Sequence, residues 1–274
     1  MNGSSRSIAI KKNIIASLFL KGISILVSLQ VVPLTINYIN PTRYGIWLTL
    51  SSIVAWLSYF DLGFAHGFRN RFAEAVAKGD MQLAREYVST TYVVLSLLFS
   101  SVFLIAIVVN HFVDWSAILN VDAAYSSELN IVFGILAFFF CLNIVASIFT
   151  TMLTANQKPA LASLIQTLGQ VFGFICIYIL TKTVPGNLDV LAFAFSGVPC
   201  FLLIIISIGM FLSGRYRHLS PSFHFVHFSL TKKIVGLGGQ FFIIMISMLF
   251  VFQLINIVIS RVAGPMAVTQ YNIA

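Results

Sequence analysis

The chain has 274 residues, of which 59% are hydrophobic and only 9% charged, and its mean hydropathy is +0.97. Soluble domains carry about 25% charged residues, so this composition excludes a soluble globular enzyme, a disordered chain and a nucleic-acid-binding protein. The apolar residues form continuous runs, whereas the strands of an outer-membrane barrel alternate with a period of two. We therefore expect an all-α, polytopic membrane protein.

A helix crosses the hydrocarbon core of a bilayer with about 20 mostly apolar residues. Seven runs of the sequence meet this requirement, and an eighth begins near Ala267. In chain order, the predicted spans are Asn13–Ile39, Tyr44–Leu62, Tyr87–Asn110, Leu129–Ala155, Ala160–Leu180, Val190–Leu212 and Ile234–Ile259. The first is longer than the hydrocarbon core is thick, so we expect it to tilt or to kink at Pro33.

The basic residues predict the orientation of the spans, because Lys and Arg concentrate in cytoplasmic loops. Of the 16 Lys and Arg residues, twelve fall on the side of the N-terminus, three on the other side, and Lys21 inside the first span. The twelve are Arg6, Lys11, Lys12, Arg69, Arg71, Lys78, Arg85, Lys158, Arg215, Arg217, Lys232 and Lys233. We therefore predict a multi-pass protein with a cytoplasmic N-terminus.

Polar residues of the first span share one helical face, since they recur every three, four or seven positions. They are Asn13, Ser17, Lys21, Ser24, Ser28 and Thr35. A lysine at the centre of a membrane helix costs ~2.5–3.5 kcal/mol, so Lys21 is expected either to reach the headgroups or to line a water-filled cavity. The serines on the same face favour the cavity.

Three later spans carry similar polar faces. Asn143 and Ser147 share a face of the fourth span, and Gln166 and Gln170 share a face of the fifth. Asn256 belongs to a third set, in the seventh span, with Gln253 and Ser260. Single polar residues often only pack or bond within membrane helices, but facing stripes on several helices predict a shared polar lumen.

The cytoplasmic loops and the outer helix ends supply further candidates. Asp61 ends the second span, where it either pins a turn or pairs with Lys21 or Arg69 in the cavity. The segment Phe68–Tyr87 has an amphipathic pattern and is expected to lie on the membrane surface. His224 and His227 belong to an aromatic cytoplasmic loop, without the Cys or carboxylate partners of a metal site.

Aromatic residues near the outer ends of the spans predict an interfacial belt. They are Tyr38, Tyr44, Trp47 and Trp115. Three cysteines, Cys141, Cys176 and Cys200, lie inside apolar runs and read as small buried hydrophobes. The sequence contains no catalytic motif, and we expect neither a catalytic residue, a cofactor nor a resident metal.

A weak internal echo links the start of the chain to its end. Lys11-Lys12 precedes a long span and then Pro41, and Lys232-Lys233 precedes a long span and then Pro265. Transporters often contain two structural repeats. The echo predicts a six-helix lobe over residues 1–231 and the start of a second lobe over residues 232–274.

Two groups of motifs carry a family resemblance. They are Asn40-Pro41-Thr42-Arg43-Tyr44-Gly45-Ile46-Trp47, Tyr59-Phe60-Asp61-Leu62-Gly63-Phe64 and Ala77-Lys78-Gly79-Asp80, then Ala263-Gly264-Pro265-Met266-Ala267-Val268 and Tyr271-Asn272-Ile273-Ala274. The chain thus resembles the N-terminal part of Wzx-type polysaccharide flippases, the O-antigen and capsule translocases of the MATE-like (MOP) superfamily. The resemblance implies twelve or fourteen helices in two lobes around a cavity. By that standard we expect the chain to be a fragment.

The resemblance implies a place in the bacterial cytoplasmic (inner) membrane and a role in polysaccharide biosynthesis, for example of lipopolysaccharide O-antigen. The implied substrate is an isoprenoid-diphosphate-linked oligosaccharide, moved by alternating access among membrane lipids. Lys21, with Arg69, would offset its diphosphate charge. The resemblance allows coupling to an ion, which no residue here identifies. Two alternatives stay open, a multidrug or cation antiporter of the same superfamily and a membrane-embedded glycan-modifying enzyme.

Overall fold

The structure is a computed structural model that describes residues 3–57, 63–236 and 254–273. All regular elements in these ranges are helices, as expected for an all-α membrane protein. Five stretches of the described residues are long and apolar enough to cross a bilayer. They are Asn13–Ile39, Met81–Phe112, Ala123–Ala155, Pro159–Thr183 and Leu188–Leu212. These stretches confirm the helical extent of the first, third, fourth, fifth and sixth predicted spans.

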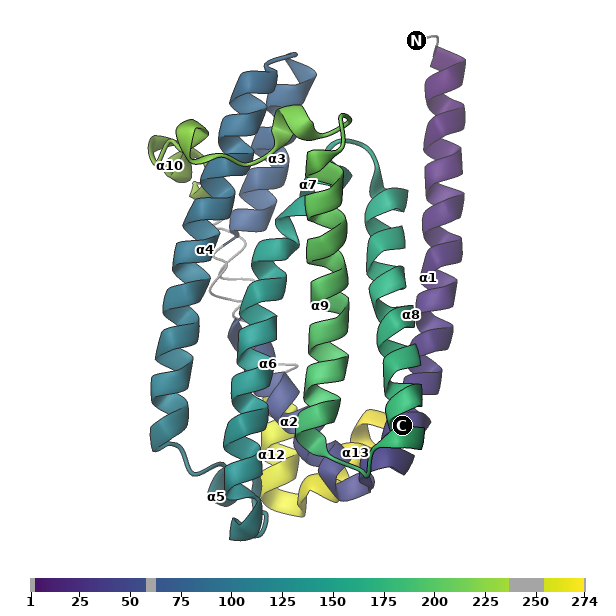
Figure 1. The fold of residues 1–274 in the computed structure, drawn as a ribbon, viewed down its shortest axis with the longest axis vertical. Coiled ribbons are helices and arrows are strands. Elements are labelled where there is room, and N and C mark those ends of the chain that lie inside the picture. Colours follow the sequence, from purple (N-terminus) through teal and green to yellow (C-terminus); the bar gives the residue numbers. More distant parts are fainter. Residues whose placement is uncertain (1–2, 58–62, 237–253, 274) are drawn as a thin grey trace.

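Five long helices stand side by side and form one layer of the bundle (Figure 1). In their order across the layer they are α4 (Met81–Phe112), α6 (Ser126–Ala146), α9 (Leu188–Leu212), α8 (Pro159–Thr183) and α1 (Gly3–Ile39). After α6 the chain continues into α7 (Ile148–Ala155), with Ser147 between the two helices. The helix α1 continues through Pro33 to Ile39.

Shorter helices pack on this layer at its two ends (Figure 1). At the end near the α1 N-terminus lie α3 (Phe64–Ala77) and α10 (Ser229–Val235). At the opposite end lie α2 (Pro41–Ala55), α5 (Trp115–Leu119), α12 (Leu254–Ala263) and α13 (Pro265–Ile273). The second predicted span is therefore helical in α2, and residues 58–62 of it lie outside the described residues. Of the seventh span, only the ends are described.

Local sequence sets where α2 and α4 begin. Asn40 accepts a hydrogen bond from the Arg43 amide at 3.0 Å, and Pro41 occupies the first helical turn of α2. Proline suits that position because the first amides of a helix have no intrahelical acceptor. Asp80 caps α4 in the same way, accepting from the Leu83 amide at 2.9 Å. The turn at Asp80 leads from α3 into α4, and these two helices pack against each other.

The amphipathic segment after the second span was expected to lie on the membrane surface, and the structure corrects this prediction. Phe68 and Phe72 are fully buried, because α3 packs its apolar face on α4 and α7. The segment therefore contacts protein through the face that was expected to contact lipid. Periodicity identifies an apolar face but does not identify the surface that covers it.

The predicted aromatic belt is wrong for three of its four members. Tyr44, Trp47 and Trp115 are buried in the core that joins α2, α5 and α6. The Trp115 indole donates to the Asn110 side chain at 2.6 Å and stacks on Phe133. These rings fill the interior of the bundle at the end opposite the α1 N-terminus.

The helices α12 and α13 are fixed to α2 by close packing and by hydrogen bonds. A Cβ atom on Gly45 would lie 1.8 Å from the Pro265 carbonyl oxygen, so only glycine permits this approach. Thr269 donates to the Pro41 carbonyl at 2.7 Å. Asn256, expected to face a lumen, is instead buried and donates to the Ser52 hydroxyl at 2.6 Å.

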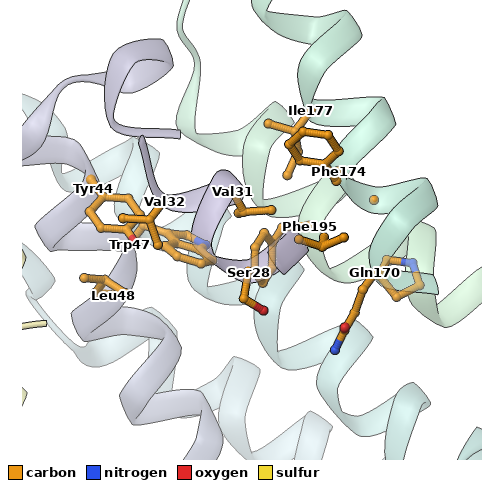
Figure 2. A pocket seen from close by; sticks show the side chains of 13 residues that line it. Ser28, Val31, Val32, Tyr44, Trp47, Leu48, Gln170, Phe174, Ile177 and Phe195 are labelled. Atoms are coloured by element: carbon orange, nitrogen blue, oxygen red, sulfur yellow. The ribbon is translucent and has the colours of Figure 1, made fainter. Parts of the chain in front are cut away.

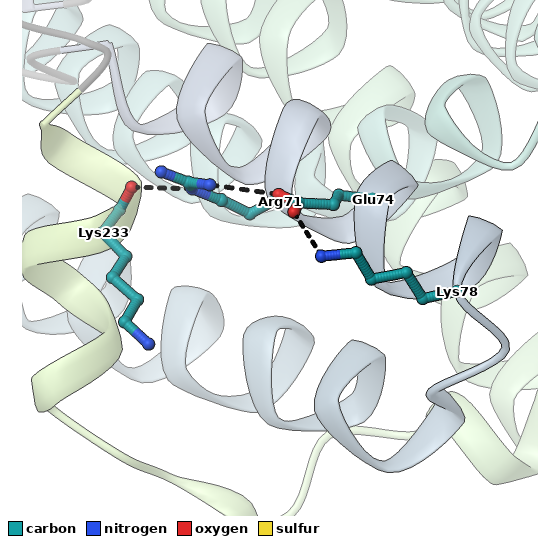
Figure 3. Close-up of polar contacts among 4 residues, drawn as sticks. All are labelled: Arg71, Glu74, Lys78 and Lys233. Carbon is teal, nitrogen blue, oxygen red and sulfur yellow. Dashed lines mark hydrogen bonds and ion pairs between the residues drawn. The ribbon is translucent and has the colours of Figure 1, made fainter.

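At the other end, one arginine ties α3 to α10 (Figure 3). The Arg71 Nε donates to the Lys233 carbonyl at 3.2 Å, and its Nη1 lies 3.0 Å from a Glu74 oxygen. Lys78 reaches the other Glu74 oxygen at 2.7 Å. Lys78 first, and then Arg71, lower the pKa of the Glu74 carboxyl below its ordinary value. The guanidinium also satisfies a carbonyl at the C-terminal end of α10.

We expect Gly45→Val to destabilise the chain by about 1–3 kcal/mol, the usual cost of forcing atoms into a packed interface. The matched control is Gly22→Val on α1, where an added Cβ atom meets nothing within 4 Å. Thermal unfolding of the two purified variants in detergent would measure the difference. Equal unfolding temperatures would contradict the close α2–α13 contact.

Candidate functional site

A cavity of about 300 Å³ lies between α1, α2, α8 and α9. Figure 2 shows Tyr44, Trp47 and Leu48 of α2 on one side of it, and Gln170, Phe174 and Ile177 of α8 on the other. Its polar groups come mainly from Ser28 and Gln170. Mostly apolar walls with a few polar groups are typical of small-molecule sites.

A second cavity, of about 270 Å³, lies between α2, α6 and α9. Ser51, Asn143 and Ser196 supply its polar side chains. Trp47, Phe195 and Pro199 line both cavities, so the two spaces are neighbours on either side of these residues. We call them the α1-side cavity and the α6-side cavity.

The Trp47 and Phe195 rings form the partition between the cavities. Their centroids lie 4.6 Å apart, in an edge-to-face arrangement. The Trp47 side chain is 6% exposed, and its indole N–H has no hydrogen-bond partner. The Ser51 hydroxyl is also buried without a partner. Both residues line the cavities, so the partition carries two unpaired buried donors in otherwise apolar surroundings.

Pro199 shapes the α9 wall of both cavities. A proline inside a helix removes the hydrogen bond to the carbonyl four residues earlier, which here is that of Phe195. The helix α8 approaches this point closely, since a Cβ atom on Gly169 would lie 3.2 Å from the Pro199 Cα. A backbone acceptor is thereby freed at the residue whose ring divides the cavities.

The predicted polar stripe of α1 faces α8 and is partly used in helix packing. The Ser24 hydroxyl donates to the Gln170 side-chain oxygen, and Ser28 donates to the Ser24 carbonyl at 2.9 Å. Ser17 is half-buried, and its hydroxyl has no partner. The structure therefore brings Ser24, Ser28 and Gln170 together, with Ser28 and Gln170 lining the cavity.

Lys21 lies on the flank of α1 and outside both cavities. Its side chain is exposed, and none of the described residues forms a hydrogen bond or an ion pair with it. Ser28 lies two turns further along the same side of the helix, a rise of about 10 Å. Lys21 thus lies closer to the N-terminus of α1 than the α1-side cavity does.

The other predicted site residues are spread over the molecule. Asn143 lines the α6-side cavity, whereas Ser147 donates to the Ile144 carbonyl at 2.7 Å where α6 ends. Gln166 is exposed on α8, and Arg69 is exposed on α3, away from the cavities. Asp61 lies outside the described residues. The polar stripes therefore do not converge on one lumen in this structure.

The aromatic partition was missed by sequence reasoning, which assigned Trp47 to the membrane interface. No periodic signal distinguishes a buried tryptophan from an interfacial one near a helix end. Neither cavity is lined by a charged residue among those described. No group of three or more His, Cys, Asp or Glu residues that could hold a metal occurs in the described ranges.

A different group of charges lies at the end of the bundle opposite the α1 N-terminus. Arg43 lies 3.5 Å from Glu128 and donates to the Gly186 carbonyl at 3.1 Å. One guanidinium thus connects the start of α2 to the start of α6 and to the α8–α9 turn. Tyr38 of α1 donates to the Pro185 carbonyl of the same turn at 3.2 Å.

Comparison with known proteins gives one family and one similar fold. The family described as polysaccharide biosynthesis protein matches residues 10–274. No curated protein matches the chain. A structure of a multidrug resistance MATE family transporter of the MOP superfamily, in an inward-facing conformation, is similar with a TM-score of 0.63 and 15% identity. The alignment covers 86% of this chain and 56% of that transporter, so the chain spans little more than half its length.

We expect cysteines introduced at Ser28 and Asn143 to react with a hydrophilic thiol reagent on the order of ten-fold faster than one at Leu26. Thiolates form in water and are disfavoured in apolar surroundings, and Leu26 is 64% exposed on α1 and lines neither cavity. The background would carry Cys141→Ala, Cys176→Ala and Cys200→Ala, and labelling would be followed by mass spectrometry in nanodiscs. Equally slow labelling at all three positions would show that the cavities are dry.

Proposed function

The chain belongs to the polysaccharide biosynthesis protein family, and on that premise we propose that it moves an isoprenoid-diphosphate-linked oligosaccharide across the bacterial cytoplasmic membrane. The observation that carries the proposal is the pair of adjacent cavities inside a MATE-like bundle. Hydroxyl and amide groups from Ser28, Gln170 and Asn143 would solvate sugar hydroxyls. The isoprenoid chain would stay in the lipid.

The cavity walls favour a sugar over a permanently charged substrate. A cation exporter of the same superfamily is the second candidate, suggested by the similar multidrug transporter fold. Cations inside a membrane protein usually pair with buried carboxylates, and no acidic side chain lines either cavity among the described residues. In the proposed mechanism, Lys21 meets the diphosphate near the cytoplasmic end of α1 while the sugar enters the cavity.

The proposed transport cycle is alternating access between two lobes. We infer that residues 1–231 form the first lobe and that residues 232–274 begin the second. The α2–α13 contact, with Gly45 against Pro265, supports a state closed at the end opposite the N-terminus. With a cytoplasmic N-terminus, that state is open inward.

The proposal assigns positioning and solvation to the protein and no covalent chemistry. A membrane-embedded enzyme acting on glycans would need a catalytic constellation near the membrane surface. Of the described acidic residues in the α4–α6 connection, Asp114 and Asp122 cap short helices, and Glu128 lies 3.5 Å from Arg43. The first carboxyl has a lowered pKa, because Ser116 donates a hydrogen bond to it.

We predict that Lys21→Glu lowers polysaccharide export at least ten-fold, whereas Lys21→Arg retains it, because only the first change reverses the charge offered to a diphosphate. A ten-fold loss corresponds to about 1.4 kcal/mol. The measurement is surface polysaccharide in cells that depend on this protein for export. The matched control is Lys182→Glu, which makes the same charge reversal in the last turn of α8.

Equal export by the Glu and Arg variants would remove Lys21 from the mechanism. The same cells would be tested for efflux of a cationic dye. Dye efflux that requires the protein, without any effect on polysaccharide, would favour the cation exporter instead.

A further inference from the structure

A segment between α9 and α10 lies across the end of α4 and leaves aromatic and basic side chains exposed. This segment, residues 213–228, is called the strap here, and it contains the short helices η3 (Arg217–Leu219) and η4 (Phe223–Phe225). The Ser222 amide donates to the Ser89 hydroxyl at 3.1 Å, and the His227 amide donates to the Thr90 hydroxyl at 3.0 Å. Both hydroxyls are fully buried, so water does not compete for these bonds, and they fix the position of the strap on α4.

Further contacts hold the strap at both of its halves. Tyr216 and Leu219 are buried to 1% exposure and anchor the first half in the core. In the second half, the Arg85 guanidinium lies 4.2 Å from the centre of the Phe225 ring, and its Nε donates to the Ser220 carbonyl at 2.9 Å. The strap is therefore an ordered part of the fold.

The strap and α4 together enclose a groove of about 460 Å³. The groove is lined by Ser89, Tyr92, Val93, Ser96, Leu97, Pro221, Ser222 and Phe223. Its lining is largely apolar, and Leu97 on its wall is 59% exposed. The exposed stripe of α4 continues beyond the groove with Leu104, Ile105 and Val108. The groove is therefore continuous with the apolar side of a membrane-spanning helix.

The exposed side chains of the strap match the boundary between lipid and water. Phe223 is 87% exposed and Phe228 is 62% exposed, at the end of a spanning helix, where aromatic residues contact headgroups. Arg215 and Arg217 are exposed on the same strap, and residues 213–236 contain no acidic residue. The nearest acid on α4 is Glu86, which lies 3.8 Å from His227.

We propose that this groove binds one anionic phospholipid from the adjacent leaflet. An acyl chain would occupy the apolar groove along α4, and the phosphate would lie beside the strap arginines. An apolar groove alone would accept any lipid, but the unbalanced positive charge of the strap selects an anionic headgroup. This inference is independent of the substrate that the cavities carry.

The test is lipid binding to the purified chain, measured by native mass spectrometry with phosphatidylglycerol or phosphatidylcholine added to the detergent. We expect one saturable phosphatidylglycerol, bound at least five-fold more tightly than phosphatidylcholine. Arg215→Gln with Arg217→Gln should remove that preference, since each basic residue near anionic lipid is worth about five-fold in affinity. Leu97→Trp, which fills the groove, should weaken binding of both lipids.

Matched controls separate this site from general lipid contact. Leu104→Trp makes the same change on the same α4 stripe outside the groove. Lys182→Gln with Arg261→Gln removes two charges from the last turns of α8 and α12, and both helices end at the opposite end of the bundle. Both should bind as the unchanged chain does. Glycerol phosphate, a headgroup without a tail, should not compete.

Three results would overturn the proposal. One is the absence of any preference for phosphatidylglycerol, and the second is equal weakening by the groove variant and its control. The third is full competition by glycerol phosphate, which would identify a site for a free anion. Unfolding temperatures near that of the unchanged chain would show that every variant is folded.

Discussion

The constraint on which this structure depends is that polar groups inside an apolar medium need partners. The chain meets it in two ways. Ser24 and Gln170 bond to each other across α1 and α8, and Asn256 bonds to Ser52 across α12 and α2. Around Trp47 and Ser51, by contrast, buried donors have no protein partner, and the cavities lie beside them. Polar residues that look alike in the sequence thus either bond to a neighbouring helix or line a cavity, depending on what lies opposite them.

Small residues determine which pairs of helices approach each other closely. Glycine at position 45 lets α2 touch the Pro265 carbonyl, and glycine at position 169 lets α8 touch Pro199. Without a strong hydrophobic force between helices in lipid, close backbone packing is the main source of helix association. The second of these contacts lies at Pro199, which lines both cavities together with Trp47 and Phe195. The close α8–α9 contact therefore adjoins the wall that the two cavities share.

The sequence predicts the long helices well because a continuous apolar run of about 20 residues has few alternative structures. It does not predict which face of a helix meets protein and which meets lipid, since both surroundings are apolar. Phe68, Phe72 and Trp47 illustrate this, each being buried in protein where an interfacial position was expected. For the same reason Ser28 and Gln170 could be recognised as a polar face, but their shared cavity with α2 could not. That cavity depends on the tertiary contact of α1 with α8, which leaves no periodic trace in one sequence.

The separation of charge from cavity follows from the cost of burying an ion. A cation fixed in the middle of the bundle would need a buried carboxylate or water to offset its desolvation. Here the described cavity walls are neutral, and the described basic side chains lie on helix flanks or at helix ends, as Lys21 and Arg71 do. Neutral hydroxyls and amides can exchange their hydrogen bonds from one sugar hydroxyl to the next at little cost in free energy. No charge is left uncompensated when the site empties. Under the proposed function, a diphosphate would meet cations only where water also reaches. The sugar could then cross a neutral interior without a binding site too strong to release it.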